Sequence, residues 1–351
     1  MHPIDLIPVP DAVPVAWGWF QVLLTVTFVL HVIFMNFMLG GAVIALVATL
    51  RGGTRPDIAG WLGGKLPFSV AFAVNAGVAP LLFVQVLYGH FVYSSSILMA
   101  AAWFAIIPLL IVAYYALYAF RGRTAPGART LLIGSATLIL LFIGFLFTNN
   151  WTLSVTPEKW GAYFTHAGGT FWNLDEPTLW PRYLHMVVGA VAVAGLGMAA
   201  FGRVREGRTG DGGGLVGHGM AWFKWATLGQ LALGLWWLLV LRSDVMKLFM
   251  GGNPVATAAF GAGFLLAVGA LLTGFLQKVW PSVGLTAGTL LAMAVMREYV
   301  RYGYVRAHFT PDQLRVDPQV SSLVLFLATF AVGIGCIWYM LRLAAHAGKE
   351  V

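Results

Sequence analysis

Nine long apolar runs constrain this 351-residue chain more than any other feature of its sequence. Crossing the hydrocarbon core of a bilayer takes a helix of about 20 residues, and all but the eighth run approach or exceed that length. The runs are expected near residues 17–50, 68–90, 97–120, 131–148, 183–201, 220–241, 255–276, 282–296 and 321–343. We therefore predict an all-α integral membrane protein with nine transmembrane helices, which form one domain over residues 1–351.

The composition supports this prediction and excludes several other classes of protein. Hydrophobic residues make up 59% of the chain and charged residues only 10%, whereas soluble proteins carry about 25% charged residues. These values exclude a water-soluble enzyme, a disordered protein and a nucleic-acid binder. The single cysteine, Cys336, excludes a disulfide framework, a cysteine-ligated zinc site and covalent c-type haem attachment.

Basic residues are distributed unevenly between the two sets of connections that nine spans create. One set, with the C-terminus, holds 13 Lys and Arg against four Asp and Glu, whereas the other holds eight against nine. Connections rich in Lys and Arg stay in the cytoplasm. We therefore expect the N-terminus outside and the C-terminus in the cytoplasm.

Three histidines fall within or at the ends of apolar runs, where an ionisable group is costly and often functional. His31 lies inside the first run, His90 at the predicted end of the second, and His185 in the first turn of the fifth. Each could be a structural histidine bonded to a neighbouring helix, or a ligand to a metal or to haem iron. Their spacing alone leaves both interpretations open.

Two other groups have the composition of a cofactor site at the same predicted outer level. Glu298 stands between Arg297 and Arg301 at the end of the eighth run, so it either pairs with these arginines or helps them to bind haem propionates. Met246 and Met250 precede the seventh run and could supply a thioether ligand. Methionine is more often a packing residue, and that alternative stays open.

Several short motifs resemble those of subunit I of cytochrome bd quinol oxidase, and in particular its shorter relatives that lack the oxygen-reducing site. The nine spans and the outside N-terminus match that subunit. The matching motifs are His31, Phe34 and Leu39-Gly40; Gly77-Val78-Ala79 with Gly89; Asn150-Trp151 with Pro157; His185; and Glu298-Tyr299-Val300-Arg301.

The resemblance implies two or more haem b groups. His31 matches a histidine that binds a high-spin haem, and His185 matches the ligand of the low-spin haem. The sixth ligand of the low-spin haem would come from Met246, Met250 or His90.

Three departures from the family pattern bear on activity. The third run carries none of the acidic residues that deliver protons in the oxidases, and the eighth-span glutamate is replaced by the apolar residues 290–293. The long quinol-binding loop is reduced to Arg242–Pro254. The departures argue against oxygen reduction and against a quinol site in its usual place.

These observations together predict a membrane cytochrome b subunit. It would pass electrons between the quinone pool and an outer-face carrier such as a c-type cytochrome, beside a second membrane subunit in a bacterial-type plasma membrane. One alternative is a terminal quinol:oxygen oxidase subunit, and another is a haem-free scaffold or transporter subunit. The absorption spectrum separates the haem-free alternative from the other two.

Overall fold

The computed structural model describes residues 9–52, 57–212 and 214–347. Within these residues nine helices are long and apolar enough to cross a membrane, which confirms the all-α prediction with nine candidate spans. They are α1 (Trp17–Arg51), α2 (Ile58–Leu98), α3 (Ala100–Gly122), α4 (Pro126–Ser154), α5 (Leu179–Thr209), α6 (Leu215–Val240), α8 (Pro254–Phe275), α9 (Val279–Val305) and α10 (Val320–Ala347).

Several helices extend beyond the apolar runs seen in the sequence, because a helix can continue past the hydrocarbon core. Helix α9 runs to Val305, nine residues past the predicted end of the eighth span. Helix α2 does not end at His90 as the sequence suggested, and it continues to Leu98 after a kink. The kink lies at Tyr88, whose φ of −135° and ψ of 28° depart from helical values.

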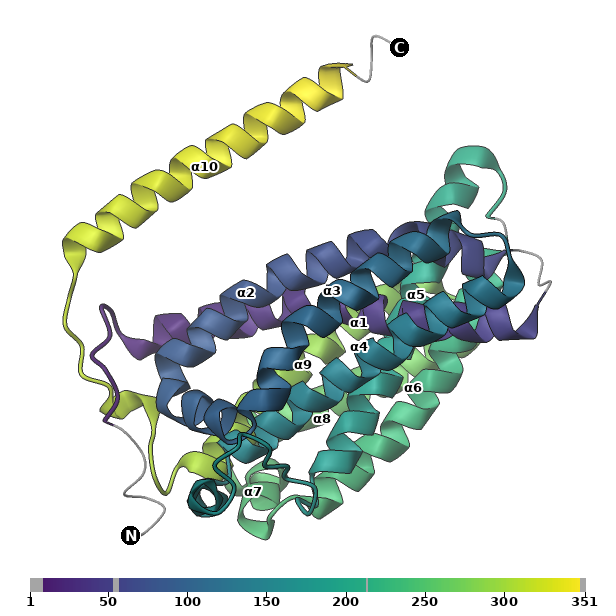
Figure 1. Cartoon of the computed structure of the whole chain (residues 1–351). Helices are drawn as coiled ribbons and strands as arrows, with labels where there is room; N and C mark the ends of the chain where they lie inside the picture. The colour runs from purple at the N-terminus through teal and green to yellow at the C-terminus, as the bar shows by residue number, and fades with distance from the viewer. Residues whose placement is uncertain (1–8, 53–56, 213, 348–351) are drawn as a thin grey trace.

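Helices α1 to α9 pack into one elongated bundle, and α10 stands apart from it (Figure 1). The closest pairs are α1 with α2, α5 with α6, α8 with α9, α1 with α5, and α3 with α4. Every described side chain of α10 from 320 to 343 is exposed. The bundle alone therefore positions the candidate site.

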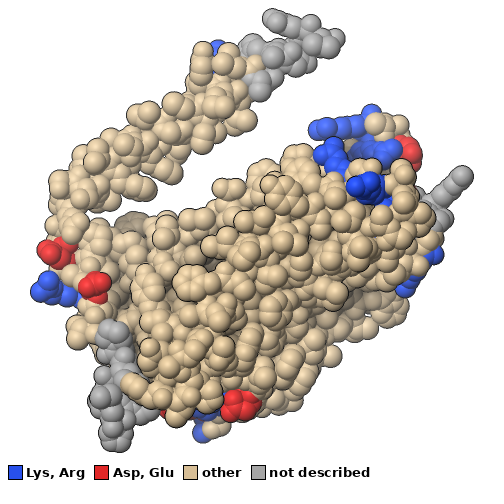
Figure 2. All heavy atoms as spheres, viewed as in Figure 1, with Lys and Arg blue, Asp and Glu red and all other residues tan. Residues whose placement is uncertain are grey.

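Lys and Arg gather at one end of the bundle, as Figure 2 shows, where α5 has its C-terminal turns. Arg203, Arg205 and Arg208 lie there, all exposed. The opposite end carries the beginnings of α1 and α5 and is called the predicted outer end below. Four residues of the charge count, Asp5, Arg55, Lys349 and Glu350, lie outside the described residues.

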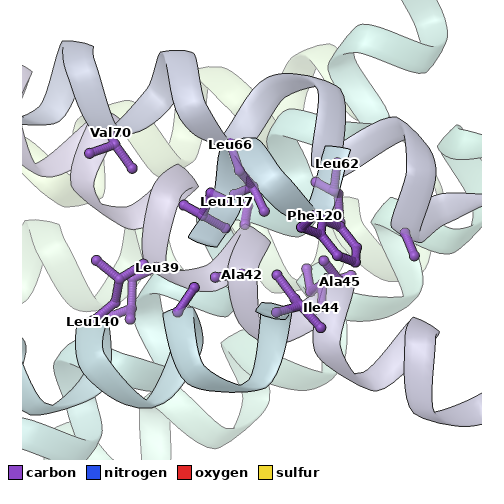
Figure 3. Packing of buried hydrophobic residues seen from close by; sticks show 14 of the residues in the cluster. Leu39, Ala42, Ile44, Ala45, Leu62, Leu66, Val70, Leu117, Phe120 and Leu140 are labelled. Carbon is purple, nitrogen blue, oxygen red and sulfur yellow. The ribbon is translucent and has the colours of Figure 1, made fainter. Parts of the chain in front are cut away.

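The half of the bundle toward the arginine-rich end has a continuous apolar core (Figure 3). Its side chains come from α1 to α6 and include Leu39, Leu62, Leu117 and Leu140. A Cβ added at Gly40 would collide with the backbone carbonyl of Ala190. This contact brings α1 and α5 together as closely as two helices can pack, which small residues permit in membranes.

The predicted outer end is built from short elements as well as helix ends. They are the 3₁₀ helix η2 (Pro157–Phe164), the short helix α7 (Ser243–Lys247), the π turn η3 (Leu248–Gly252) and the 3₁₀ turn η4 (Pro311–Gln313). A single parallel β-bridge joins Val13, before α1, to Val316, before α10. Polar side chains concentrate in this half of the molecule.

Candidate functional site

His185 lies in the second turn of α5 and is 9% exposed. Both of its ring nitrogens, Nδ1 and Nε2, are buried without a hydrogen-bond partner. Its Cε1 faces α6, where a Cβ added at Gly234 would lie 3.3 Å away, and its ring is 5.7 Å from that of Trp237. An imidazole inside a membrane bundle with both nitrogens unpaired has both of them available to a bound group.

Arg182 lies three residues before His185, on the same side of α5. Its guanidinium carbon lies 3.1 Å from the ring centroid of Trp151 and 5.0 Å from that of Trp237. One of its nitrogens is buried without a hydrogen-bond partner, and the described residues hold no ion pair with it. The apolar pattern alone did not indicate Arg182, although an arginine directly before an apolar run, one turn from a histidine, is a usable signal.

Helix α9 contributes two more arginines to this end of the bundle. Glu298 accepts hydrogen bonds from Arg297 at 2.8 Å and from Arg301 at 2.6 Å, so the pairing that the sequence left open is present. Arg297 lies 4.0 Å from the Phe28 ring on α1, and Arg301 lies 4.7 Å from the Tyr88 ring on α2.

The three arginines interact electrostatically with one another and with Glu298. Because Glu298 is the one carboxylate in ion pairs with them in the described part of the chain, the cluster carries an excess of about two positive charges. Such an excess in a low-dielectric region favours a bound anionic group. Carboxylates of a cofactor or substrate are groups of that kind.

Further buried polar atoms without hydrogen-bond partners occur on α1, α4 and α6. Native proteins leave few buried polar groups unpaired, and each one needs an explanation. In addition to His185 and Arg182, the unpaired atoms on α1, α4 and α6 belong to Gln21, Trp151, Thr227, Gln230 and Trp237. Of these residues, Trp151 and Trp237 contact Arg182 and so belong to this end of the bundle.

His31 is partly buried on α1, and its surroundings fix the role of its ring. Its Nδ1 lies 2.9 Å from the carbonyl oxygen of Ala73 on α2. A carbonyl can only accept, so Nδ1 carries the proton and Nε2 keeps a free electron pair. This is the usual arrangement of a histidine that binds a metal through Nε2. Gly77 makes room for the ring, because a Cβ there would lie 2.9 Å from Nδ1.

His31 and His185 lie at similar depths in the bundle. Gly40 touches Ala190, and α1 and α5 run in the same direction because three spans separate them. His31 is nine residues before this contact on α1, and His185 is five residues before it on α5. The difference of four residues corresponds to about 6 Å along the bundle axis at the rise of an α-helix.

The other predicted ligands occupy different surroundings. His90 packs between the rings of Phe91 and Phe309, each with its centroid 4.5 Å from that of His90, and it lines a pocket at the predicted outer end. Met246 packs against the apolar cluster of that end. Met250 lies in the π turn and is 52% exposed.

The short connection from α6 to α8 is held by charge pairs outside the membrane-spanning helices. Arg242 donates to both carboxylate oxygens of Asp244, at 2.7 and 2.9 Å. These hydrogen bonds lower the pKa of Asp244 from 3.8 to about 2, with a smaller contribution from the charge of Arg306. Buried Val245 packs against Gly303 of α9. The connection is therefore compact and attached to the bundle.

The described residues contain no group of three or more His, Cys, Asp or Glu side chains placed to hold a metal ion. The possible metal donors are the imidazoles of His31 on α1 and His185 on α5. Arginines of α5 and α9 lie at the same end of the bundle. This donor set suits a prosthetic group whose iron is held by one or two histidines and whose rim carries carboxylates.

Comparison with protein-family models and with curated protein sequences finds no match. In three dimensions the chain is similar to a chain of bd oxidase from Geobacillus thermodenitrificans. The superposition covers 97% of this chain and 98% of that chain, with a TM-score of 0.63 and 12% sequence identity. At that identity the likeness concerns the fold alone, and the chain has a bd oxidase-type fold of membrane-spanning helices.

Proposed function

We propose that this chain is a haem b-binding membrane subunit that transfers electrons between the quinone pool and a carrier at the outer face, such as a c-type cytochrome. The observation that carries the proposal is His185, a buried imidazole with both ring nitrogens unpaired, one helical turn from an arginine without an ion pair. The bd oxidase-type fold supports a respiratory role, and a second membrane subunit would accompany the chain.

The residues of the site fit a haem b group. His185 and His31 would each hold an iron through a neutral imidazole, and His31 has Nε2 free for this because Nδ1 is bonded to Ala73. Arg182, Arg297 and Arg301 supply the positive charge that haem propionates require. Because Arg297 and Arg301 share Glu298, they stay fixed in orientation before any ligand binds.

Haem, when bound, supplies one-electron redox chemistry, and the protein adjusts its potential through ligands and surroundings. The side chains of the site would have three roles in binding haem and setting its potential. The imidazoles hold the iron, the arginines favour the more negative form of a nearby group, and the aromatic rings of Trp151 and Trp237 exclude water from Arg182.

Oxygen reduction is not part of the proposal. In the cytochrome bd oxidases that this sequence resembles, acidic side chains of the third span deliver protons. Helix α3 of this chain contains no Asp or Glu from Ala100 to Gly122. Proton transfer across a bilayer generally uses such side chains. Quinol-dependent oxygen uptake by the purified protein would contradict this interpretation.

The test is spectroscopic. The purified chain is expected to show a Soret band that shifts on reduction with dithionite, and a pyridine haemochrome typical of haem b. His185→Ala is expected to remove the low-spin component, whereas His166→Ala, at an exposed loop position bonded to Thr165, leaves the spectrum unchanged. A protein without a Soret band, folded and monodisperse, would favour the haem-free scaffold or transporter instead.

A further inference from the structure

Helix α2 carries an amide side chain on its exposed face, well inside the membrane. Asn75 is exposed and lies within the second apolar run, ten residues from Lys65. Ten residues of α-helix rise about 15 Å, which is half the thickness of the hydrocarbon core. The other amide side chains on the nine long helices, within the described residues, are buried or half-buried; they are Gln21, Asn36, Gln85, Asn149, Asn150 and Gln230. In a single copy of the chain, the Asn75 amide would face lipid, where an unpaired polar group costs free energy.

The hydrogen bonding of Asn75 is incomplete within its own chain. Its Nδ2 donates to the carbonyl oxygen of Ala71, one turn earlier on α2, at 2.8 Å. In the part of the chain that the structure describes, this is the one hydrogen bond of the side chain, so the second N–H and Oδ1 stay available. Helix α10 stands apart from the bundle (Figure 1) and leaves Asn75 exposed. The amide therefore offers both a donor and an acceptor to a partner.

The side chains around Asn75 repeat with the spacing of a helix-pairing surface. Successive members lie four or three residues apart and form the α2 seam, which consists of Phe68, Phe72, Asn75, Ala79, Leu82 and Val86. Its four large apolar side chains are between 40% and 57% exposed. A regular alternation of three and four residues keeps one stripe of a helix turned toward a second helix over several turns. The α2 seam thus has the pattern of one half of a helix pair.

We propose that the α2 seam binds the same seam of a second copy of this chain, and that the two Asn75 amides hydrogen-bond to each other. Copies inserted into the membrane in the same direction present parallel α2 helices. In a two-fold symmetric pair, identical residues then meet at each level along the two helices. The pairing depends on α2 alone and does not require a bound haem.

The chemistry of Asn75 favours a second copy over a different partner. A carboxamide donates through Nδ2 and accepts through Oδ1, so it is complementary to another carboxamide. A single asparagine in an otherwise apolar seam fixes the alignment and the number of paired helices, because any shift leaves its polar atoms unpaired. Polar side chains that hydrogen-bond between helices also stabilise helix pairs in membranes. A purely apolar helix laid on the seam would leave both Asn75 amides unsatisfied.

The seam is also held in place before a partner binds. The ring of Phe72 stacks on that of Phe34 on α1, with centroids 5.2 Å apart, although Phe72 is 57% exposed. The backbone of α2 is fixed against α1 by the hydrogen bond between His31 and the Ala73 carbonyl, two residues before Asn75. A surface that is already ordered loses less conformational entropy on association.

The first test is disulfide crosslinking of the full-length chain in the membranes of the producing cells. The Cys336→Ala background removes the single native thiol, so an introduced cysteine can crosslink only to another copy. Asn75→Cys and Leu82→Cys, both on the seam, should form covalent dimers on oxidation with copper phenanthroline. Val74→Cys, exposed on the same helix but off the seam, is the matched control and should stay monomeric. Leu265→Cys, on the exposed face of α8, should stay monomeric as well.

The second test measures the contribution of the amide. Energy transfer between donor-labelled and acceptor-labelled copies in proteoliposomes gives the dissociation constant of the pair. Asn75→Leu should raise this constant about tenfold, the effect of losing an interhelical hydrogen bond, whereas Asn75→Gln keeps the amide and should raise it less. Because Asn75 is exposed, both variants should unfold at the wild-type temperature.

Several outcomes would overturn the inference. One is the absence of covalent dimers at both Asn75 and Leu82, and another is equal crosslinking at Val74 and Asn75. A disulfide within one chain between Asn75→Cys and the native Cys336 would mean that α10 of the same chain covers the seam. Equal dissociation constants for the wild type and Asn75→Leu would show that the amide takes no part in pairing.

Discussion

The environment of His31 shows how one backbone carbonyl can decide the chemistry of a side chain. A neutral histidine side chain has two tautomers, and the Ala73 carbonyl selects the one with the proton on Nδ1. The carbonyl is within reach only because Gly77 has no side chain. A glycine on α2 therefore controls a candidate ligand on α1.

Gly77→Ala tests this dependence. The added Cβ would lie 2.9 Å from Nδ1 and Cε1 of His31, so the ring must move and its bond to Ala73 must lengthen or break. We expect an altered high-spin component in the reduced-minus-oxidised spectrum. Gly64→Ala is the control on the same helix, because nothing lies within 4 Å of a Cβ there. Identical spectra for the two variants would show that His31 has no part in the site.

A pH dependence follows from Asp244, outside the membrane-spanning helices. The pKa of Asp244 is about 2 in the folded protein, below its ordinary value of 3.8. The chief cause is the pair of hydrogen bonds that Arg242 donates to the carboxylate. The lowered pKa stabilises the fold above about pH 4, and this contribution is lost as the pH falls toward 2. Because the side chain is 41% exposed, the effect is small, below about 1 kcal/mol.

The comparison of Asp244→Asn with the wild type measures this contribution. Thermal unfolding followed by tryptophan fluorescence should show the variant less stable than the wild type at pH 6, with a difference that shrinks as the pH falls through 2. Asp312→Asn, at an exposed position in η4, serves as the control. A stability difference that grows as the pH falls would contradict the assigned sign.

At the scale of the helices, the approach of α1 to α5 sets the geometry of the site, because it fixes the relative depth of His31 and His185. Gly40→Leu should separate the two helices, since its side chain would occupy the backbone of Ala190. Forcing a large side chain into a packed contact costs about 1–3 kcal/mol or more. The expected result is a lower unfolding temperature and loss of the haem spectrum.

Gly261→Leu on α8 is the matched control for this substitution, because nothing lies within 4 Å of a Cβ at Gly261. It should unfold at the wild-type temperature. Equal stability of the Gly40 and Gly261 variants would mean that α1 and α5 adjust to the larger side chain.

The sequence was sufficient for the existence of the nine spans, since each is a long apolar run. It also singled out His185, because a histidine in the first turns of such a run is unusual. It could not give the contacts of Tyr88 with Phe309 and Arg301, because both partners come from the far end of the chain. For the same reason it did not give the aromatic surroundings of Arg182 or the pocket at His90.

For the whole molecule, the distribution of basic residues predicts which end faces the cytoplasm. In a Cys336→Ala background, a membrane-impermeant maleimide applied to intact cells should label Thr165→Cys, which is exposed at the predicted outer end. It should not label Arg208→Cys at the arginine-rich end until the cells are opened. The reverse pattern would invert the proposed direction of electron transfer relative to the membrane.

The bridge between Val13 and Val316 has a consequence for biosynthesis. Its two strands are separated by almost the entire chain, so a ribosome must release nearly all the spans before these residues can meet. Contacts between residues so far apart in sequence form late in folding. The bridge is thus completed only after the helices have been inserted, and a nascent chain interrupted before the ninth span would contain His31 and His185 but lack this bridge.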